Sequence, residues 1–165
     1  RCGRCGCNRY YAEVIFMQEF VLPCLYAFFG SCGFCFLFNV RGADVFLSGL
    51  CGMLSWLVYL LFGGMFETDI MQYLFAAAAL GLQAEILARL RKVPVTLYLI
   101  IGMVPLVPGA RIFYTMEDFL RGENASFLSN LLYTVKIGGA IAVGLVVSKL
   151  VFNLIISKLI KKRPV

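Results

Sequence analysis

Long apolar runs separated by short polar gaps fill most of this 165-residue chain. Several runs approach the roughly 20 apolar residues that a helix needs to cross about 30 Å of hydrocarbon. The runs lack the alternation of apolar and polar positions that a transmembrane β-barrel requires. The pattern therefore predicts an all-α fold, a polytopic membrane helical bundle with about five transmembrane helices. The predicted spans are Phe20–Phe38, Val45–Phe62, Ile70–Ala88, Val93–Val107 and Phe127–Leu150.

Composition excludes a soluble fold. Hydrophobic residues make up 61% of the chain and charged residues 15%, and the mean hydropathy is +0.87. Average soluble domains are nearer half apolar and a quarter charged. A chain of this length has too little interior to bury so much apolar surface, so a bilayer has to solvate the outer faces of its helices.

Charged residues gather in the gaps between the runs and predict how the chain is oriented. The basic residues of the third gap and of the C-terminal tail are Arg89, Arg91, Lys92, Lys158, Lys161, Lys162 and Arg163. The second gap is negative because it carries Glu67 and Asp69, and the fourth gap has a small negative excess. Because basic loops stay cytoplasmic, we expect the N-terminus outside and the C-terminus in the cytoplasm. From Met17 on, twelve basic and eight acidic residues leave a net charge of +4, which is mostly this positive-inside excess and does not call for nucleic acid.

The first 16 residues differ from the rest of the chain. They are rich in Cys and Gly, and their arginines would place positive charge on the outer side. Met17 follows directly and precedes the first apolar run. We interpret residues 1–16 as a non-native leader or upstream remnant, and residues 17–165 as a single transmembrane domain.

Small residues recur four positions apart in two of the runs. Ser48 and Gly52 lie in the second run, and Ala140, Gly144 and Ser148 lie in the last. Small residues at this spacing let helices approach closely in lipid, so both faces predict helix–helix contacts. We expect the cysteines inside the runs to be packing residues too; they are Cys24, Cys32, Cys35 and Cys51.

The third run carries an acidic residue close to its end. Ala77, Gly81 and Glu85 lie at i, i+4 and i+8, so Glu85 continues a small-residue face and should point into the protein. A carboxylate within the membrane is a candidate for carrying protons, which makes Glu85 a candidate proton-linked group. The alternative is an ion pair with Arg89 at i, i+4, which would satisfy both charges near the interface.

The fourth run contains two prolines that do not suit the interior of a helix. Pro105 and Pro108 lack an N–H, so we expect the carbonyls of Ile101 and Val104 to lose their helical partners. Each proline also disfavours helical geometry in the residue before it. The sequence therefore predicts a Pro/Gly-broken fourth helix, and irregular backbone at membrane depth is tolerated only where protein or a water-filled cavity covers it.

The residues around this break suggest a binding function. Broken helices mark the binding sites of secondary transporters. Beyond the break, the amides from Gly109 onward begin a new helix with Arg111 in its first turn, an arrangement suited to a carboxylate. The predicted substrate path comprises Gly102, Pro105, Pro108, Gly109 and Arg111. The alternative is a kinked span that ends in a surface loop.

Other kinds of chemistry lack the residues they need. The chain has no nucleotide-binding glycine loop, no His and no Ser/His/Asp arrangement, so we predict no enzymatic activity and no cofactor. A metal site on Cys2, Cys5 and Cys7 is an alternative for the first 16 residues, but three thiolates without a fourth ligand form an incomplete set.

Two long stretches carry a resemblance. They are GFCFLFNVRGADVFLSGLCGMLSWLVYLL (33–61) and LGLQAEILARLRKVPVTLYLIIGMVPLVPGARIFYTM (80–116), followed by the Gly-rich last run. The chain resembles the threonine/serine exporter family, specifically the small-subunit, C-terminal-module type of its split two-component exporters. Arg111 departs from the resemblance, in which a small residue is expected after PLVPGA.

The resemblance implies a multi-pass subunit of the bacterial plasma (inner) membrane that acts with a larger membrane subunit of the same family. It implies export of threonine and serine or of a dicarboxylate such as succinate, coupled to the proton gradient as in an antiporter. An odd number of spans would let a related partner lie in inverted orientation. The alternatives are a non-transporting assembly or regulatory subunit and a homo-oligomeric channel.

Overall fold

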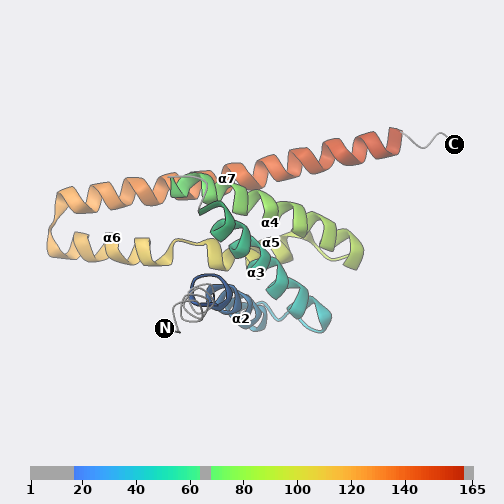
Figure 1. The fold of residues 1–165 in the computed structure, drawn as a ribbon, viewed down its shortest axis with the longest axis horizontal. Helices are drawn as coiled ribbons and strands as arrows, with labels where there is room; N and C mark the ends of the chain where they lie inside the picture. Colours follow the sequence, from blue (N-terminus) through green and yellow to red (C-terminus); the bar gives the residue numbers. More distant parts are fainter. Residues whose placement is uncertain (1–16, 64–67, 162–165) are drawn as a thin grey trace, which may run out of the picture.

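The computed structural model describes residues 17–63 and 68–161, with side chains as far as residue 155, and the elements in these ranges are all helical. In chain order they are η1 (Met17–Val21), α2 (Leu22–Leu37), α3 (Ala43–Gly63), α4 (Asp69–Arg91), α5 (Val95–Met103), η2 (Val104–Leu106), α6 (Gly109–Arg121) and α7 (Asn124–Lys161) (Figure 1). The all-α prediction is confirmed for this part of the chain. The interpretation of residues 1–16, the thiolates of Cys2, Cys5 and Cys7, and Glu67 lie outside the described residues.

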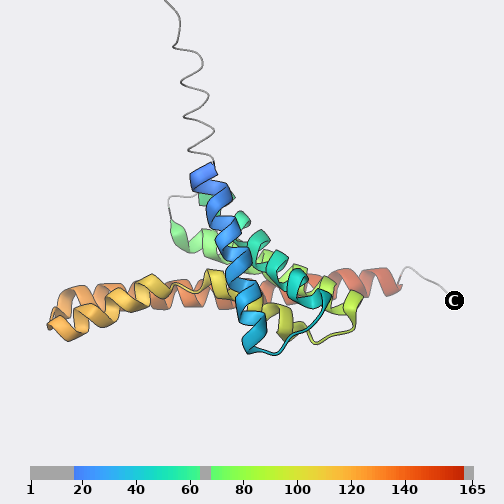
Figure 2. The ribbon, with the colours of Figure 1, turned by 90° about the horizontal axis from the view of Figure 1, so that it is seen from below.

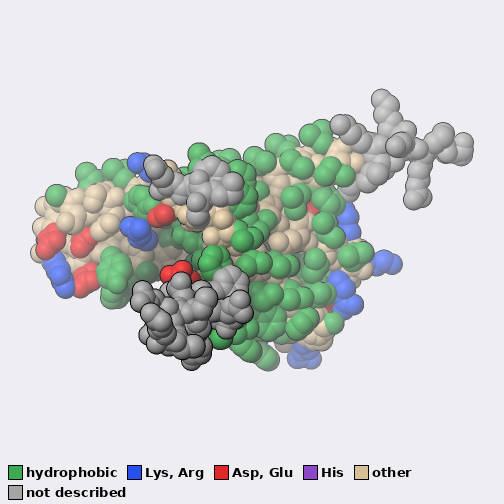
Figure 3. Space-filling view, in the orientation of Figure 1, with side chains coloured by type: hydrophobic (Ala, Val, Ile, Leu, Met, Phe, Trp, Pro, Cys, Tyr) green, Lys and Arg blue, Asp and Glu red, His purple; other side chains and the backbone are tan. Residues whose placement is uncertain are grey.

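The lengths of the helices support a membrane bundle. Four described helices are long and apolar enough to cross a membrane, and a bent pair of shorter helices brings the number to as many as five. The four are Met17–Leu37, Ala43–Gly63, Asp69–Arg91 and Asn124–Ile155, and the bent pair is Val95–Leu106 with Gly109–Arg121. Figure 3 shows apolar side chains over most of the visible face, whereas Lys and Arg gather where α4 ends. The chain is therefore a multi-pass membrane protein.

Left-handed residues end several helices. Lys92 caps α4 with φ 57°, and Gly122 caps α6 with φ 75°. Such residues turn the chain out of a helix while their amides still bond its last carbonyls. Asn39 and Gly42 also have positive φ, 53° and 74°, in the connection between α2 and α3. These tight turns keep consecutive helices adjacent.

Small residues set the helix crossings, as the sequence predicts. A Cβ on Gly81 would collide with Oγ of Ser148, so α4 and α7 touch there through glycine. One turn before Ser148 on α7, a Cβ on Gly144 would lie 2.5 Å from the carbonyl oxygen of Leu74, so the backbones of the same two helices are in close contact there. Between α2 and α3, Gly52 faces Ser31 in the same manner. Close backbone approach is the main source of helix association in lipid.

Helices α6 and α7 form a long hairpin. Figures 1 and 2 show it extending well beyond the other helices. The rings of Phe119 and Phe127 lie 5.3 Å apart across it, and Asn130 donates a 2.7 Å hydrogen bond to Asp118. With 38 residues, α7 is about 57 Å long at 1.5 Å per residue. It exceeds the thickness of the hydrocarbon, so part of the hairpin has to leave it or lie along it.

The core lies between α3, α4 and α5. Its largest fully buried side chains include Tyr98, Leu80 and Leu106. Leu106 belongs to η2, so the end of the fourth span is anchored in the core immediately before the chain bends. This anchor fixes where α6 begins.

Candidate functional site

The break in the fourth span is a sharp bend with one proline on each side of it. Pro105 lies in the single 3₁₀ turn η2, and Pro108 is the residue from which α6 starts. The two helical halves meet at 58°. The predicted break is therefore present, and the helix after it points in a new direction.

The carbonyls at the break keep hydrogen-bond partners, which corrects the sequence-based expectation. The amide of Val104 bonds the carbonyl of Ile101, and the amide of Val107 bonds that of Val104 at 3.3 Å. Each proline removes the donor four residues on, and a 3₁₀ turn uses the donor three residues on instead. The amide of Gly109 reaches the carbonyl of Val107 at 2.7 Å. A membrane tolerates the bend because these carbonyls are satisfied within the turn.

The two glycines of the predicted path differ in their surroundings. A Cβ on Gly102 would lie 2.5 Å from Cδ1 of Leu80 and 3.3 Å from Cβ of Cys51, so this glycine lets α5 pack tightly on α3 and α4. Gly109 faces open space, since no atom of another described segment lies within 4 Å of such a Cβ. The structure thus gives Gly102 a packing role and leaves the surroundings of Gly109 open.

Arg111 lies in the first turn of α6 and meets side chains from two other helices. Its Nη2 is 3.8 Å from Oδ2 of Asp69, in the first turn of α4. Its guanidinium carbon lies 4.6 Å from the ring centre of Tyr133 on α7. The hydroxyl of Tyr133 donates a 2.7 Å hydrogen bond to the same oxygen of Asp69. We name these three residues the Asp69 triad.

An aromatic run borders the Asp69 triad. The rings of Trp56 and Tyr59 stack with centres 4.9 Å apart, and those of Tyr59 and Tyr73 lie 4.7 Å apart. Tyr73 and Tyr133 pack against the same buried cluster, which comprises Ala77, Ile137 and Ile141. The run therefore connects α3 and α4 and reaches the packing around Tyr133.

A pocket opens at the other end of this run, beside Pro105. Its volume is about 330 Å³. Its lining is mostly apolar and comprises Pro23, Tyr26, Ala27, Gly30, Trp56, Val104 and Pro105. The indole N–H of Trp56 is buried and, among the described residues, has no hydrogen-bond acceptor. The break thus has an open pocket beside it and a charged triad after it.

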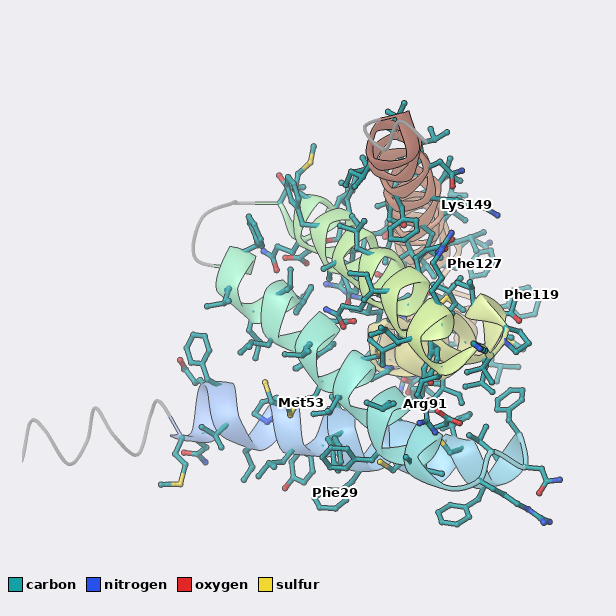
Figure 4. All side chains as sticks on the ribbon, turned by 90° about the vertical axis from the view of Figure 1, so that its right-hand side faces the viewer. Phe29, Met53, Arg91, Phe119, Phe127 and Lys149 are labelled. Atoms are coloured by element: carbon teal, nitrogen blue, oxygen red, sulfur yellow. The ribbon has the colours of Figure 1, made fainter. Side chains whose placement is uncertain are left out.

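A second triad with the same residue types lies where α3 begins and α4 ends. Nε of Arg91 donates to Oδ1 of Asp44 at 2.9 Å, and the hydroxyl of Tyr98 donates to the same oxygen at 2.8 Å. We name these residues the Asp44 triad. Figure 4 shows Arg91 at the end of α4, near the first turn of α3. This triad connects the ends of three helices.

Glu85 is buried, as its face predicts, with 7% of its surface exposed. Its carboxylate pairs with Arg89, and the same guanidinium donates to the backbone carbonyl of Glu85 at 3.0 Å. The guanidinium also lies 4.1 Å above the ring of Phe152 on α7. The ion pair offered as the alternative is therefore present.

The described cysteines fit the packing role. Cys24, Cys35 and Cys51 are buried and all four in the described spans are free. The thiols of Cys32 and Cys35 both face the carbonyl of Val45, at 3.7 and 3.9 Å, so they share a face of α2. Within the described residues, no cluster of three or more Cys, Asp or Glu is placed to hold a metal ion.

Sequence reasoning found Arg111 but missed its partners. Asp69 counted only as a gap charge, and Tyr133 was one aromatic among many in an apolar run. A usable signal was present, because Asp69 and Asp44 each stand in the first turn of a long apolar helix. Neither triad follows from spacing, since Tyr133 lies 64 residues from Asp69.

Comparison with known proteins supplies the family. A family model described as "Threonine/Serine exporter, ThrE" matches residues 23–151, which include every residue of the two triads. No curated protein and no solved structure matches the chain. The family match spans well over half of the 165 residues. The chain therefore belongs to the threonine/serine exporter family.

Proposed function

We propose that the chain is a membrane subunit of a secondary exporter of small carboxylate-bearing metabolites. The candidates are threonine and serine or a dicarboxylate such as succinate. Membership of the threonine/serine exporter family supports export, and the break in the fourth span supports a substrate path within this chain.

The observation that carries the proposal is the bend between η2 and α6. It sets Arg111 at the start of a helix with its guanidinium half exposed, 47% by side chain. A helix start and a bidentate cation together favour a carboxylate. Gly102, Pro105, Pro108 and Gly109 shape the backbone that places this group, so they belong to the proposed path with it.

We further propose that the chain acts with a larger membrane subunit of the same family. If the bent pair counts as a fifth span, the two ends lie on opposite sides, so a related partner can lie inverted, as in many carriers. Apolar side chains are exposed along α2, α6 and α7 and offer surface to lipid or to such a partner. The proposed setting is a bacterial plasma membrane, with the N-terminus outside and the C-terminus in the cytoplasm.

Proton coupling completes the proposal, with Glu85 as the candidate proton-linked group. Its burial and its pairing with Arg89 make its charge matter to the packing of α4 on α7. Glu85→Gln should make export independent of the pH gradient if Glu85 carries the proton. Export with the pH dependence of the unsubstituted chain would leave Glu85 only its ion pair.

An export assay tests the proposed function. Cells that express this chain, the larger half or both are loaded with labelled threonine or succinate, and efflux is followed. We expect efflux only when both halves are present. Gradient-driven flux from this chain alone would instead support a homo-oligomeric channel. Efflux that needs the chain but survives every substitution along the proposed path would support an assembly or regulatory subunit.

A further inference from the structure

The Asp69 triad places both charges of a small ion pair within reach of a ligand. Asp69 and Arg111 approach only to 3.8 Å, and their side chains are 41% and 47% exposed. A pair this long and this exposed is weak. A ligand can therefore compete for either partner without breaking a strong contact.

Both residues keep hydrogen-bonding capacity on their exposed sides. A guanidinium has five N–H donors in a planar fork, and Arg111 turns one nitrogen toward Asp69. On Asp69, Oδ2 takes both the hydroxyl of Tyr133 and the guanidinium, and no donor in the described part of the chain reaches Oδ1. Asp69, which can bind a cationic group, and Arg111, which can bind an anionic group, thus lie side by side.

We infer that Asp69 is the specificity-determining residue of the proposed path, because it lies where the ammonium group of a zwitterionic α-amino acid would sit once Arg111 holds the ligand's carboxylate. Arg111 takes the ligand's carboxylate, and Oδ1 of Asp69 takes its ammonium group. The ring of Tyr133 holds the guanidinium in place, and its hydroxyl holds the carboxylate of Asp69. The inference rests on the proposed function, because it assigns a specificity-determining residue to the same path.

The same geometry disfavours a dicarboxylate. A second carboxylate would meet Asp69 instead of a cation, and like charges in one partly desolvated site repel. Specificity arises as much from such repulsion as from attraction to the right ligand. The triad therefore selects threonine over succinate, although Arg111 alone would bind either.

Equilibrium binding to the purified full chain, with the larger half where the two copurify, tests this inference. The probes are labelled threonine, labelled succinate and unlabelled 3-hydroxybutanoate, which is threonine without its ammonium group. We expect 3-hydroxybutanoate to compete at least about tenfold less well than threonine on the unsubstituted protein. Equal competition, or no threonine binding, would overturn the inference without any substitution being needed.

Substitutions then assign the effect to Asp69. Asp69→Asn should shift the ratio of threonine to succinate affinity by about tenfold toward succinate, and Asp69→Glu should keep the preference for threonine. Glu117→Gln is the matched control, because Glu117 also pairs with an arginine of α6 and is 35% exposed. A ratio unchanged by Asp69→Asn, or shifted equally by Glu117→Gln, would refute the role of Asp69.

The binding assay tests the inference, and the export assay tests the proposed function, so either claim can fail without the other. Threonine preference in the binding assay without export in cells would contradict the proposed function and leave the site in place. If the chain exports threonine but Asp69→Asn leaves the ratio of threonine to succinate affinity unchanged, the inference is contradicted and the proposed function stands.

Discussion

Two triads of the same residue types differ in how tightly they close. In the Asp44 triad the ion pair with Arg91 is 2.9 Å long, the aspartate side chain is 18% exposed and Tyr98 is fully buried. In the Asp69 triad the ion pair is 3.8 Å long and the aspartate side chain is 41% exposed. Both aspartates accept a tyrosine hydroxyl, at 2.8 and 2.7 Å. The two arginine side chains are almost equally exposed, at 45% and 47%, so the difference lies in the length of the ion pair and in the access of a ligand to the aspartate.

The backbone explains this difference. Arg91 is in the last turn of α4, and Tyr98, which shares its aspartate, belongs to the core between α3, α4 and α5. Arg111 follows the bend after η2, so its position depends on the direction in which α6 leaves the core. We interpret the Asp44 triad as a clamp on the fold and the Asp69 triad as a group open to ligands.

The largest expected effect comes from straightening the bend. In the double variant Pro105→Ala with Pro108→Ala, α6 can continue the line of α5, which carries Arg111 away from Asp69. A misplacement of about 1 Å in a functional group can cost about a hundredfold in rate, so we expect export to fall by about that factor while the protein still inserts in the membrane. Efflux of labelled threonine measures export, and an immunoblot of the membrane fraction measures insertion.

Pro94→Ala is the matched control for that experiment. Pro94 precedes the first turn of α5 and lies outside the bend. Export should stay near its original rate in this variant. Unchanged export in the double variant would remove the bend from the mechanism.

The second effect separates the triads by stability. Asp44→Ala leaves the buried hydroxyl of Tyr98 without its acceptor, which should lower the free energy of unfolding by about 1–3 kcal/mol. Asp69→Ala removes a half-exposed partner and should cost less than about 1 kcal/mol. Denaturant unfolding in detergent micelles compares the two variants. Equal losses would contradict the distinction between clamp and open group.

The third effect separates two arginines of α6. Arg111→Ala should lower export by about tenfold, since the ligand carboxylate loses a bidentate partner. Arg111→Lys should restore only part, because an ammonium has neither the planar fork nor the stacking on Tyr133. Arg121→Ala, which breaks the exposed pair with Glu117, is the control and should leave export unchanged. A similar loss in both alanine variants would indicate a general effect of charge.

The smallest effect comes from single hydroxyl groups. Tyr133→Phe removes the hydrogen bond that holds the carboxylate of Asp69. The loss of one such bond, about 0.5–1 kcal/mol, should weaken threonine binding about threefold. Tyr98→Phe should lower stability and leave the affinity unchanged. Binding isotherms measure the threonine affinity of both variants. An equal loss of affinity in the two would contradict the distinction between the triads.

Local patterns in the sequence predicted much of the fold. The apolar runs located the spans, the small residues at i, i+4 located the α4–α7 crossing, and the spacing of Glu85 and Arg89 offered their ion pair. The two prolines located the break. All of these depend on residues within a few helical turns of each other.

Long-range convergence could not be predicted in the same way. Asp44 and Arg91 are 47 residues apart, and no local periodicity links them. The partners of Arg111 depend on the direction of α6. That direction is set by the 3₁₀ turn at Pro105, in which the backbone carbonyls bond amides three residues on. A pattern of apolar runs has no information on that angle.

Substrate protection of a cysteine beside each triad tests the central claim most directly. Ala110→Cys places a thiol next to Arg111, and Ala43→Cys places one next to Asp44; both positions are exposed. Alkylation by a maleimide is measured at each position by mass spectrometry, with and without threonine. Threonine should slow the reaction severalfold at position 110 and leave position 43 unaffected. No protection at position 110, or equal protection at both, would contradict the assignment of the Asp69 triad to the substrate path.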